Sequence, residues 1–222
     1  MNHLAIDTST SRPLASYLID DRVVFDWQGP SGTFHGEELL AGIDTHVKSL
    51  GLNLADLSFI SVGIGPGTFT GLRIGVVMAK FLADVRGVPM APVPSLHAQA
   101  LSALGQKVAG KVWSLTDAKR REVYALSLSA DELHPAAIFA PERTMAISPE
   151  KFAGMLAPED LLLGEGAENY ASHWPPFAQL APAPFRYLQA RNIGLIGLEI
   201  AKRGGLLDAA LVDAIYLKTE KF

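Results

Sequence analysis

The 222-residue sequence lacks cysteine altogether. This absence excludes disulfide bonds, thiolate metal sites and a cysteine nucleophile. The sequence also lacks a run of about 18 apolar residues, which a membrane-spanning helix needs, and its N-terminus MNHLAIDTST lacks the order of a secretion signal. Basic residues are not in excess, because the net charge is −4. We therefore expect a cytoplasmic globular protein without a large basic surface for nucleic acid.

Glycine is concentrated in one stretch, GIGPGTFTGLRIG at residues 63–75, which holds five glycines. Residues 57–64 predict a strand before this loop, and residues 70–85 predict a helix after it that ends at Gly87. A glycine loop between a strand and a helix can direct backbone N–H groups at an anion such as phosphate. The stretch matches neither the P-loop nor the dinucleotide pattern, so a tight strand-to-helix connection is at least as good an interpretation.

Two aspartates have similar surroundings in the two halves of the chain. Asp7 in LAIDTSTSRPLASYLID and Asp117 in WSLTDAKRREVYALSLS each separate two strand-like runs, 110 positions apart. We therefore expect an α/β protein with duplicated lobes, an N-terminal lobe at residues 1–106 and a smaller degenerate lobe at residues 107–222. Asp7 and the hydroxyl residues after it fit either a metal–phosphate site or a turn that hydrogen-bonds its own backbone.

Two predicted helices, at residues 34–50 and 70–85, belong to the N-terminal lobe. In the second, Arg73, Lys80 and Asp84 share one narrow face and apolar residues occupy most of the remainder. A helix that covers a sheet needs one apolar stripe of roughly 100°. The additional apolar surface is buried either by a neighbouring helix or by another protein chain, and we favour another chain.

Motifs of a catalytic metal or nucleophile are absent from the sequence. It contains no HExxH, no GxSxG and no second metal ligand at a suitable distance from His35 or His97. We expect both histidines to be ordinary helix-surface or capping residues.

Four segments within about residues 1–125 carry a specific resemblance: LAIDTST, GIGPGTFTGLRIGVVMAK, VPSLHAQA and DAKRREVYALSL. They resemble the bacterial tRNA threonylcarbamoyladenosine biosynthesis family TsaB, whose members are also called YeaZ-like and are degenerate relatives of the TsaD and glycoprotease group. The resemblance implies the actin/Hsp70/sugar-kinase (ASKHA) fold. It also implies a phosphate-loop or cleft region formed by Asp7, Ser9, Thr10, Gly65, Pro66, Gly67, Thr68 and Gly71.

The resemblance also bears on metal binding. TsaD relatives hold a metal with two histidines of an NHxxxH-like pattern, and the corresponding positions here are Ser95 and Gln99. Neither side chain is a good iron or zinc ligand, and His97 is out of register with both. The resemblance therefore implies a chain without a catalytic metal or a cofactor of its own, whose partners use ATP/ADP and a metal ion.

The function implied by the resemblance is that of a non-catalytic scaffold or activator. Family members bind TsaD as a heterodimer, join the ATPase TsaE in a ternary complex and form homodimers when alone. The complex transfers threonylcarbamoyl from its adenylate to adenosine 37 of tRNAs that read ANN codons, and tRNA is contacted only through the complex. The interface lies on the first two helices, and its expected contacts are His35, Leu39, Ile43, Leu72, Arg73, Val76, Val77 and Lys80.

A stand-alone enzyme is the alternative hypothesis. A small-molecule kinase would use Asp7, Asp117 and the glycine loop, but it needs a second phosphate loop, for which DAKRREVY supplies no glycine. A glycoprotease-like peptidase needs a metal or a nucleophile, and the sequence shows neither. Turnover of ATP or peptide by the isolated chain would favour this alternative.

Overall fold

The computed structural model describes residues 1–32, 35–119, 121–137 and 143–217. Its first sheet has the strand order β3-β2-β1-β4-β5. Strand β1 pairs antiparallel with β2 and parallel with β4, so the two strand-like runs that Asp7 separates are strands and form a hairpin. The strands are β1 (Asn2–Asp7), β2 (Leu14–Ile19), β3 (Arg22–Gln28), β4 (Phe59–Gly63) and β5 (Met90–Val93).

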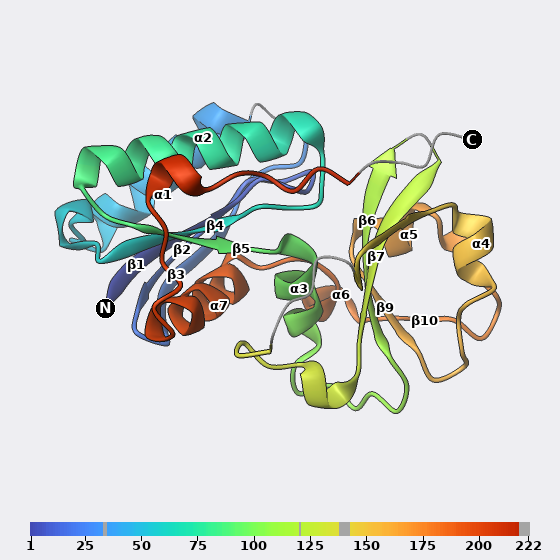
Figure 1. The fold of residues 1–222 in the computed structure, drawn as a ribbon. Coiled ribbons are helices and arrows are strands. Elements are labelled where there is room, and N and C mark those ends of the chain that lie inside the picture. The colour runs from blue at the N-terminus through green and yellow to red at the C-terminus, as the bar shows by residue number, and fades with distance from the viewer. Residues whose placement is uncertain (33–34, 120, 138–142, 218–222) are drawn as a thin grey trace.

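Helices cover both faces of this sheet (Figure 1). The two predicted N-terminal helices, α1 (His35–Ser49) and α2 (Phe69–Arg86), lie on one face, and α7 (Ala190–Lys202) lies on the other. Alternation along β1 explains this arrangement, because Leu4 and Ile6 join the core under α1 and α2 whereas Ala5 joins the core under α7. The central strands β1, β2 and β4 of the first sheet are therefore buried on both faces.

The second sheet has the order β10-β9-β6-β7-β8. Strand β6 pairs antiparallel with β7 and parallel with β9, which repeats the relation of β1 to β2 and β4. Strand β9 ends directly before Gly164, whose φ is 95°. The strands are β6 (Val112–Lys119), β7 (Glu122–Leu128), β8 (Met145–Ile147), β9 (Leu161–Leu163) and β10 (Gln179–Leu180).

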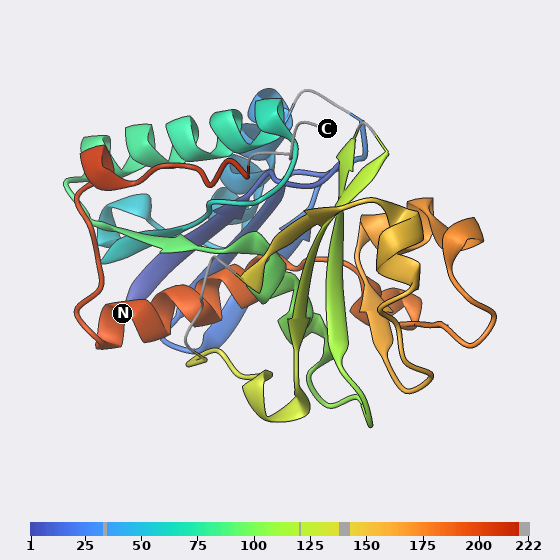
Figure 2. The ribbon, with the colours of Figure 1, turned by 45° about the vertical axis from the view of Figure 1, so that its right-hand side comes forward.

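Shorter helical segments connect the two sheets and extend the second lobe. Helix α3 (Ser95–Ala100) lies between the sheets and contacts β6, β7 and α7 (Figure 2). Helices α4 (Pro149–Ala153), α5 (Glu165–Asn169) and α6 (Ala183–Arg186) lie in the second lobe. Short 3₁₀ turns occupy Leu54–Asp56, Leu101–Ala103, Ala130–Glu132, Ala171–His173 and Ala209–Leu211.

The C-terminal part of the chain returns to the first lobe. Besides α7, Leu207 pairs with Met90, and Ile215 N–H donates to the carbonyl oxygen of Ile64 at 2.7 Å. The division at residues 1–106 and 107–222 stays a prediction. Helix α7 and the residues after it pack on the first sheet, although they belong to the second of these ranges. Among the described helices, none has the length and apolar character needed to cross a membrane.

Candidate functional site

Asp7 ends β1 and is fully buried. Its Oδ1 accepts hydrogen bonds from the backbone N–H of Ser9 at 2.7 Å and from Ser9 Oγ at 2.6 Å. Its Oδ2 accepts one from Ser95 Oγ at 2.6 Å, and the same Ser95 oxygen accepts from Gly65 N–H at 3.0 Å. The Asp7 carboxylate therefore ties together the turn after β1, the glycine loop and the start of α3.

The glycines of the loop allow this turn to approach closely. A Cβ on Gly63 would lie 1.7 Å from Asp7 Oδ2, and a Cβ on Gly67 would lie 2.4 Å from the carbonyl oxygen of Ser9. Real Cβ atoms do not come this near, because van der Waals contact needs about 3.5–4 Å. The space that a side chain at residue 63 or 67 would need is already filled by the turn after β1.

The same turn packs on the first part of α2. A Cβ on Gly71 would lie 2.1 Å from the carbonyl oxygen of Thr8, and one on Gly75 would lie 2.1 Å from Thr8 Oγ1. Thr8 Oγ1 donates to the Gly71 carbonyl at 2.7 Å, and Thr68 N–H donates to the Ser9 carbonyl at 2.9 Å. These contacts explain the glycine cluster as a strand-to-helix connection that packs closely on the hairpin turn.

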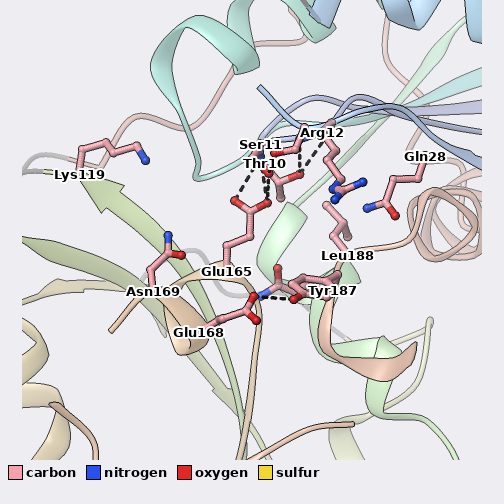
Figure 3. A pocket seen from close by; sticks show the side chains of 12 residues that line it. Thr10, Ser11, Arg12, Gln28, Lys119, Glu165, Glu168, Asn169, Tyr187 and Leu188 are labelled. Carbon is pink, nitrogen blue, oxygen red and sulfur yellow. Dashed lines mark hydrogen bonds between the residues drawn. The ribbon is translucent and has the colours of Figure 1, made fainter. Parts of the chain in front are cut away.

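A polar cleft of about 420 Å³ opens between the lobes, in front of this turn (Figure 3). Of the predicted cleft residues, Thr10 lines it, whereas Asp7 and Ser9 are buried in the turn. The carboxylate of Glu165, on α5, accepts hydrogen bonds from the backbone N–H and the hydroxyl of Ser11. The lining residues are Thr10, Ser11, Arg12, Gln28, Ser31, Gln99, Lys119, Glu165, Glu168, Asn169, Tyr187 and Leu188.

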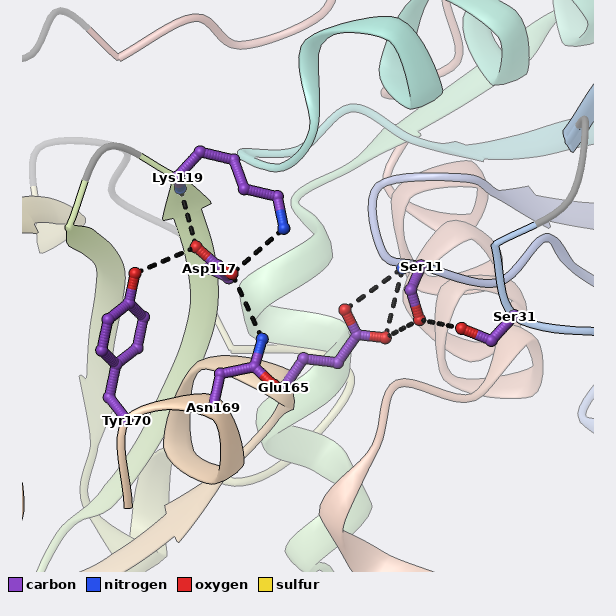
Figure 4. A network of polar contacts seen from close by, with 7 residues as sticks. All are labelled: Ser11, Ser31, Asp117, Lys119, Glu165, Asn169 and Tyr170. Atoms are coloured by element: carbon purple, nitrogen blue, oxygen red, sulfur yellow. Dashed lines mark hydrogen bonds and ion pairs between the residues drawn. The ribbon is translucent and has the colours of Figure 1, made fainter. Parts of the chain in front are cut away.

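Asp117, the counterpart of Asp7 in the second lobe, is also surrounded by donors (Figure 4). It forms an ion pair with Lys119 at 3.1 Å, and it accepts hydrogen bonds from Asn169 Nδ2 at 3.2 Å and Tyr170 Oη at 3.3 Å. Burial alone would raise the pKa of Asp117, but the backbone N–H and the ammonium of Lys119 lower it overall. Its carboxylate is therefore held ionised by groups of its own lobe.

The two positions that the resemblance equates with metal ligands, Ser95 and Gln99, form hydrogen bonds within the chain. Ser95 is bound to Asp7 as described, and Gln99 Nε2 donates to Ser114 Oγ at 2.8 Å and to the Leu115 carbonyl at 3.3 Å. Across the described ranges, no three His, Cys, Asp or Glu side chains are grouped as they would be to hold a metal ion.

The structure tests the expectation for one of the two histidines, His97. His97 is buried in α3, so its interpretation as a helix-surface residue was wrong. Burial, followed by the nearby His134 and Arg143, lowers the pKa of His97 to about 4. The imidazole is therefore neutral at physiological pH. His35 begins α1, but its side chain lies outside the described part of the structure.

Most of the predicted interface residues on α1 and α2 are buried inside the first lobe. Leu39, Ile43, Leu72 and Val76 are at most 6% exposed, and three of them belong to the main core cluster. The prediction that these four side chains form surface contacts is therefore corrected. Leu39, Ile43 and Val76 join the core over the sheet. Leu72 lies against the glycine loop at Gly65.

A different row of α2 faces outward. It comprises Phe69, Arg73, Val77, Phe81 and Val85, which recur every four residues; we call it the α2 ridge. Its four apolar side chains are 54% to 65% exposed. Residues four apart are neighbours on a helix surface, so the ridge is a row of adjacent exposed side chains, four apolar and one arginine, that winds gradually around the helix. Among the predicted contacts, Arg73 and Val77 belong to it.

The C-terminal segment flanks the α2 ridge on one side. Tyr216 lies with its ring centroid 5.3 Å from that of Phe69, and its hydroxyl accepts a hydrogen bond from Arg73 Nε at 3.4 Å. Lys80, another predicted contact, is half-buried and forms an ion pair with Asp213 at 3.5 Å. Because Asp213 is exposed, this pair contributes little stability, about 0–1 kcal/mol. The segment nevertheless extends the surface beside the ridge.

Two mixed sheets with a repeated hairpin and a cleft between them define an α/β protein of the ASKHA class. The family model of TsaD, tRNA N6-adenosine threonylcarbamoyltransferase, matches residues 31–221. The chain belongs to this family, and within it the chain is TsaB-like, or YeaZ-like.

Three similar proteins illustrate the relationship. The tRNA threonylcarbamoyladenosine biosynthesis protein TsaB of Bacillus subtilis is 34% identical over 124 residues, 56% of this chain and 53% of that protein. The Escherichia coli protein of the same name is 32% identical over 132 residues, 60% of this chain and 57% of that protein. The match thus spans just over half the length of these curated relatives. The structure of YeaZ from Pseudomonas aeruginosa has a TM-score of 0.79 at 25% identity, covering 97% of this chain and 99% of that one.

Proposed function

We propose that this chain is a non-catalytic subunit in the biosynthesis of tRNA threonylcarbamoyladenosine, located in the cytoplasm. It docks on a TsaD-type transferase, works together with TsaE and supports threonylcarbamoyl transfer to adenosine 37 of tRNAs that read ANN codons. The names of the B. subtilis and E. coli relatives support the pathway. The observation that supports the docking role is the α2 ridge.

The ridge has the composition of a protein interface. Val77 and the aromatic Phe81 are 65% and 63% exposed, and Arg73 belongs to the same row. Contiguous exposed apolar surface marks protein-binding sites, and aromatic residues and arginine are enriched in them. The same surface would serve for TsaD in the complex and for a second copy when the chain is alone.

The contacts around Asp7 support the non-catalytic part of the proposal. Asp7 and Ser95 bind each other, and Gln99 binds Ser114, so these side chains have structural partners in the folded chain. Chemistry, with its ATP/ADP and metal ion, would take place on the partners. The tRNA would be contacted through the complex, since this chain carries a net charge of −4.

Reconstitution with the cognate TsaD, TsaE and an ANN-reading tRNA tests the proposal. Transfer of threonylcarbamoyl should require this chain, and the isolated chain should turn over neither ATP nor peptide. Full transfer without the chain would contradict the activator role. Turnover by the rigorously purified chain would favour the kinase or peptidase hypothesis instead, particularly if a Glu165→Ala substitution in the cleft abolished it.

A further inference from the structure

One contact in the cleft joins the two lobes directly. Both carboxylate oxygens of Glu165 accept from the backbone N–H of Ser11 at 3.2 Å, and Ser11 Oγ also donates to Oε1. Ser31 Oγ in turn donates to Ser11 Oγ at 3.1 Å. Ser11 lies in the turn between β1 and β2 and Glu165 begins α5, 154 positions later (Figure 4).

The donors of this contact suit an anion. The N–H and the hydroxyl of Ser11 converge on a single carboxylate, and hydrogen bonds to an ionised acceptor are about twice as strong as neutral ones. The contact is partly buried and both residues line the cleft, so solvent and salt screen it less than they screen an exposed pair. The carboxylate of Glu165, which belongs to the second lobe, thus fills the position at Ser11 of the first lobe where an anion would bind.

Both ends of the contact are anchored in their own lobes. Behind Glu165, a Cβ on Gly164 would lie 2.0 Å from the Leu115 carbonyl oxygen, and one on Gly166 would lie 3.0 Å from the Leu115 carbonyl carbon. The start of α5 is therefore packed on β6. On the other side, the turn that carries Ser11 is packed on the glycine loop through Ser9. The lobes cannot separate at the cleft without breaking the hydrogen bonds between Glu165 and Ser11.

We propose that Glu165 is a carboxylate latch that holds the two lobes in a closed arrangement through Ser11. The latch does not depend on the proposed role in tRNA modification. The chain by itself then exchanges between a closed and an open arrangement of the two lobes, and loss of the Glu165 carboxylate shifts this equilibrium toward the open arrangement.

Spin-label distances between the lobes test the latch in the full-length chain. The chain has no cysteine, so Leu50→Cys in the first lobe and Met155→Cys in the second give a unique label pair at exposed positions. The label pair is combined with Glu165→Gln, which keeps the side-chain shape and removes the charge, with Ser11→Ala, or with both. The matched control is Glu168→Gln, because Glu168 lines the same cleft but binds Arg186 and Tyr187 of its own lobe.

The latch predicts that Glu165→Gln and Ser11→Ala each lengthen or broaden the distance distribution. The double variant should change the distribution no more than the single variant with the larger effect does. Glu168→Gln should leave the distribution unchanged. Hydrogen exchange of the Ser11 amide in Glu165→Gln should become about tenfold faster, the effect of losing one charge-assisted hydrogen bond. Distributions of Glu165→Gln and Ser11→Ala that match the parent would overturn the latch. So would an equal broadening in Glu168→Gln.

Discussion

Replacing Gly67 with valine tests how tightly the glycine loop packs on the turn after β1. A Cβ at residue 67 would lie 2.4 Å from the Ser9 carbonyl oxygen and 2.6 Å from Ser9 Cβ. Contact distances of about 3.5 Å require the turn to move by roughly 1 Å, which also weakens the 2.9 Å hydrogen bond from Thr68 N–H to Ser9. Overpacking costs about 1–3 kcal/mol and the weakened hydrogen bond about 1 kcal/mol, so we expect a loss of about 2–4 kcal/mol.

Urea and thermal unfolding followed by circular dichroism measure this loss. In a chain of this size each kcal/mol lowers the unfolding temperature by about 2–4 °C, so a decrease of about 4–16 °C is expected. Gly154→Ala is the control, because a Cβ there meets only the Lys151 carbonyl oxygen at an ordinary 3.5 Å. A Gly67→Val protein within about 0.5 kcal/mol of the parent would refute the packing argument.

Three further predictions concern buried polar groups and metals. Ser95→Ala removes the hydroxyl between Asp7 and Gly65 N–H, so the free energy of unfolding in urea should fall by about 1–3 kcal/mol, and an unchanged value would count against the network. Burial alone would raise the pKa of Asp160, but two backbone N–H donors and an indole N–H lower it overall. The ionised carboxylate therefore stabilises the fold above its unfolded pKa of about 3.9. This stabilisation is lost as the pH falls through the lower pKa of the folded state. The acid-induced loss of stability should therefore be smaller in Asp160→Asn than in the parent, and equal pH profiles would contradict this. Elemental analysis of the purified chain should find no stoichiometric iron or zinc, and a metal bound at α3 in a crystal structure would contradict that expectation.

The elements that carry strong local patterns were predictable from the sequence. The hairpin around Asp7, the strand before the glycine loop and the helix that ends at Gly87 each depend on nearby residues, and Gly87 indeed ends α2 with a φ of 66°. Strand β3 is mostly exposed and its apolar run is only three residues long, at residues 23–25, so its sequence gives a weaker signal. The periodicity of the α7 sequence shows that the helix has an apolar face, but it does not encode which of the two sheets that face packs on.

The outward face of α2 was predicted only in part, with Arg73 and Val77 exposed but Leu72 and Val76 buried, because the helix is apolar nearly all round. A better signal was the row of small residues Gly71, Gly75, Ala79 and Ala83, all of which are buried. Small residues let a helix approach the backbone beneath it, so such a row marks the inner side and places the α2 ridge opposite. The pairing of Glu165 with Ser11 had no local signal, since it joins residues 154 positions apart.

Light scattering of this chain mixed with its cognate TsaD tests the docking claim most directly. The parent should form a complex with the summed mass, and Phe81→Asp, which places a charge at the α2 ridge, should weaken association more than about tenfold while folding normally. Met155→Asp, at an exposed apolar position of the second lobe, should bind like the parent. A parent that stays separate from TsaD, or a folded Phe81→Asp protein that binds as tightly as the parent, would contradict the account.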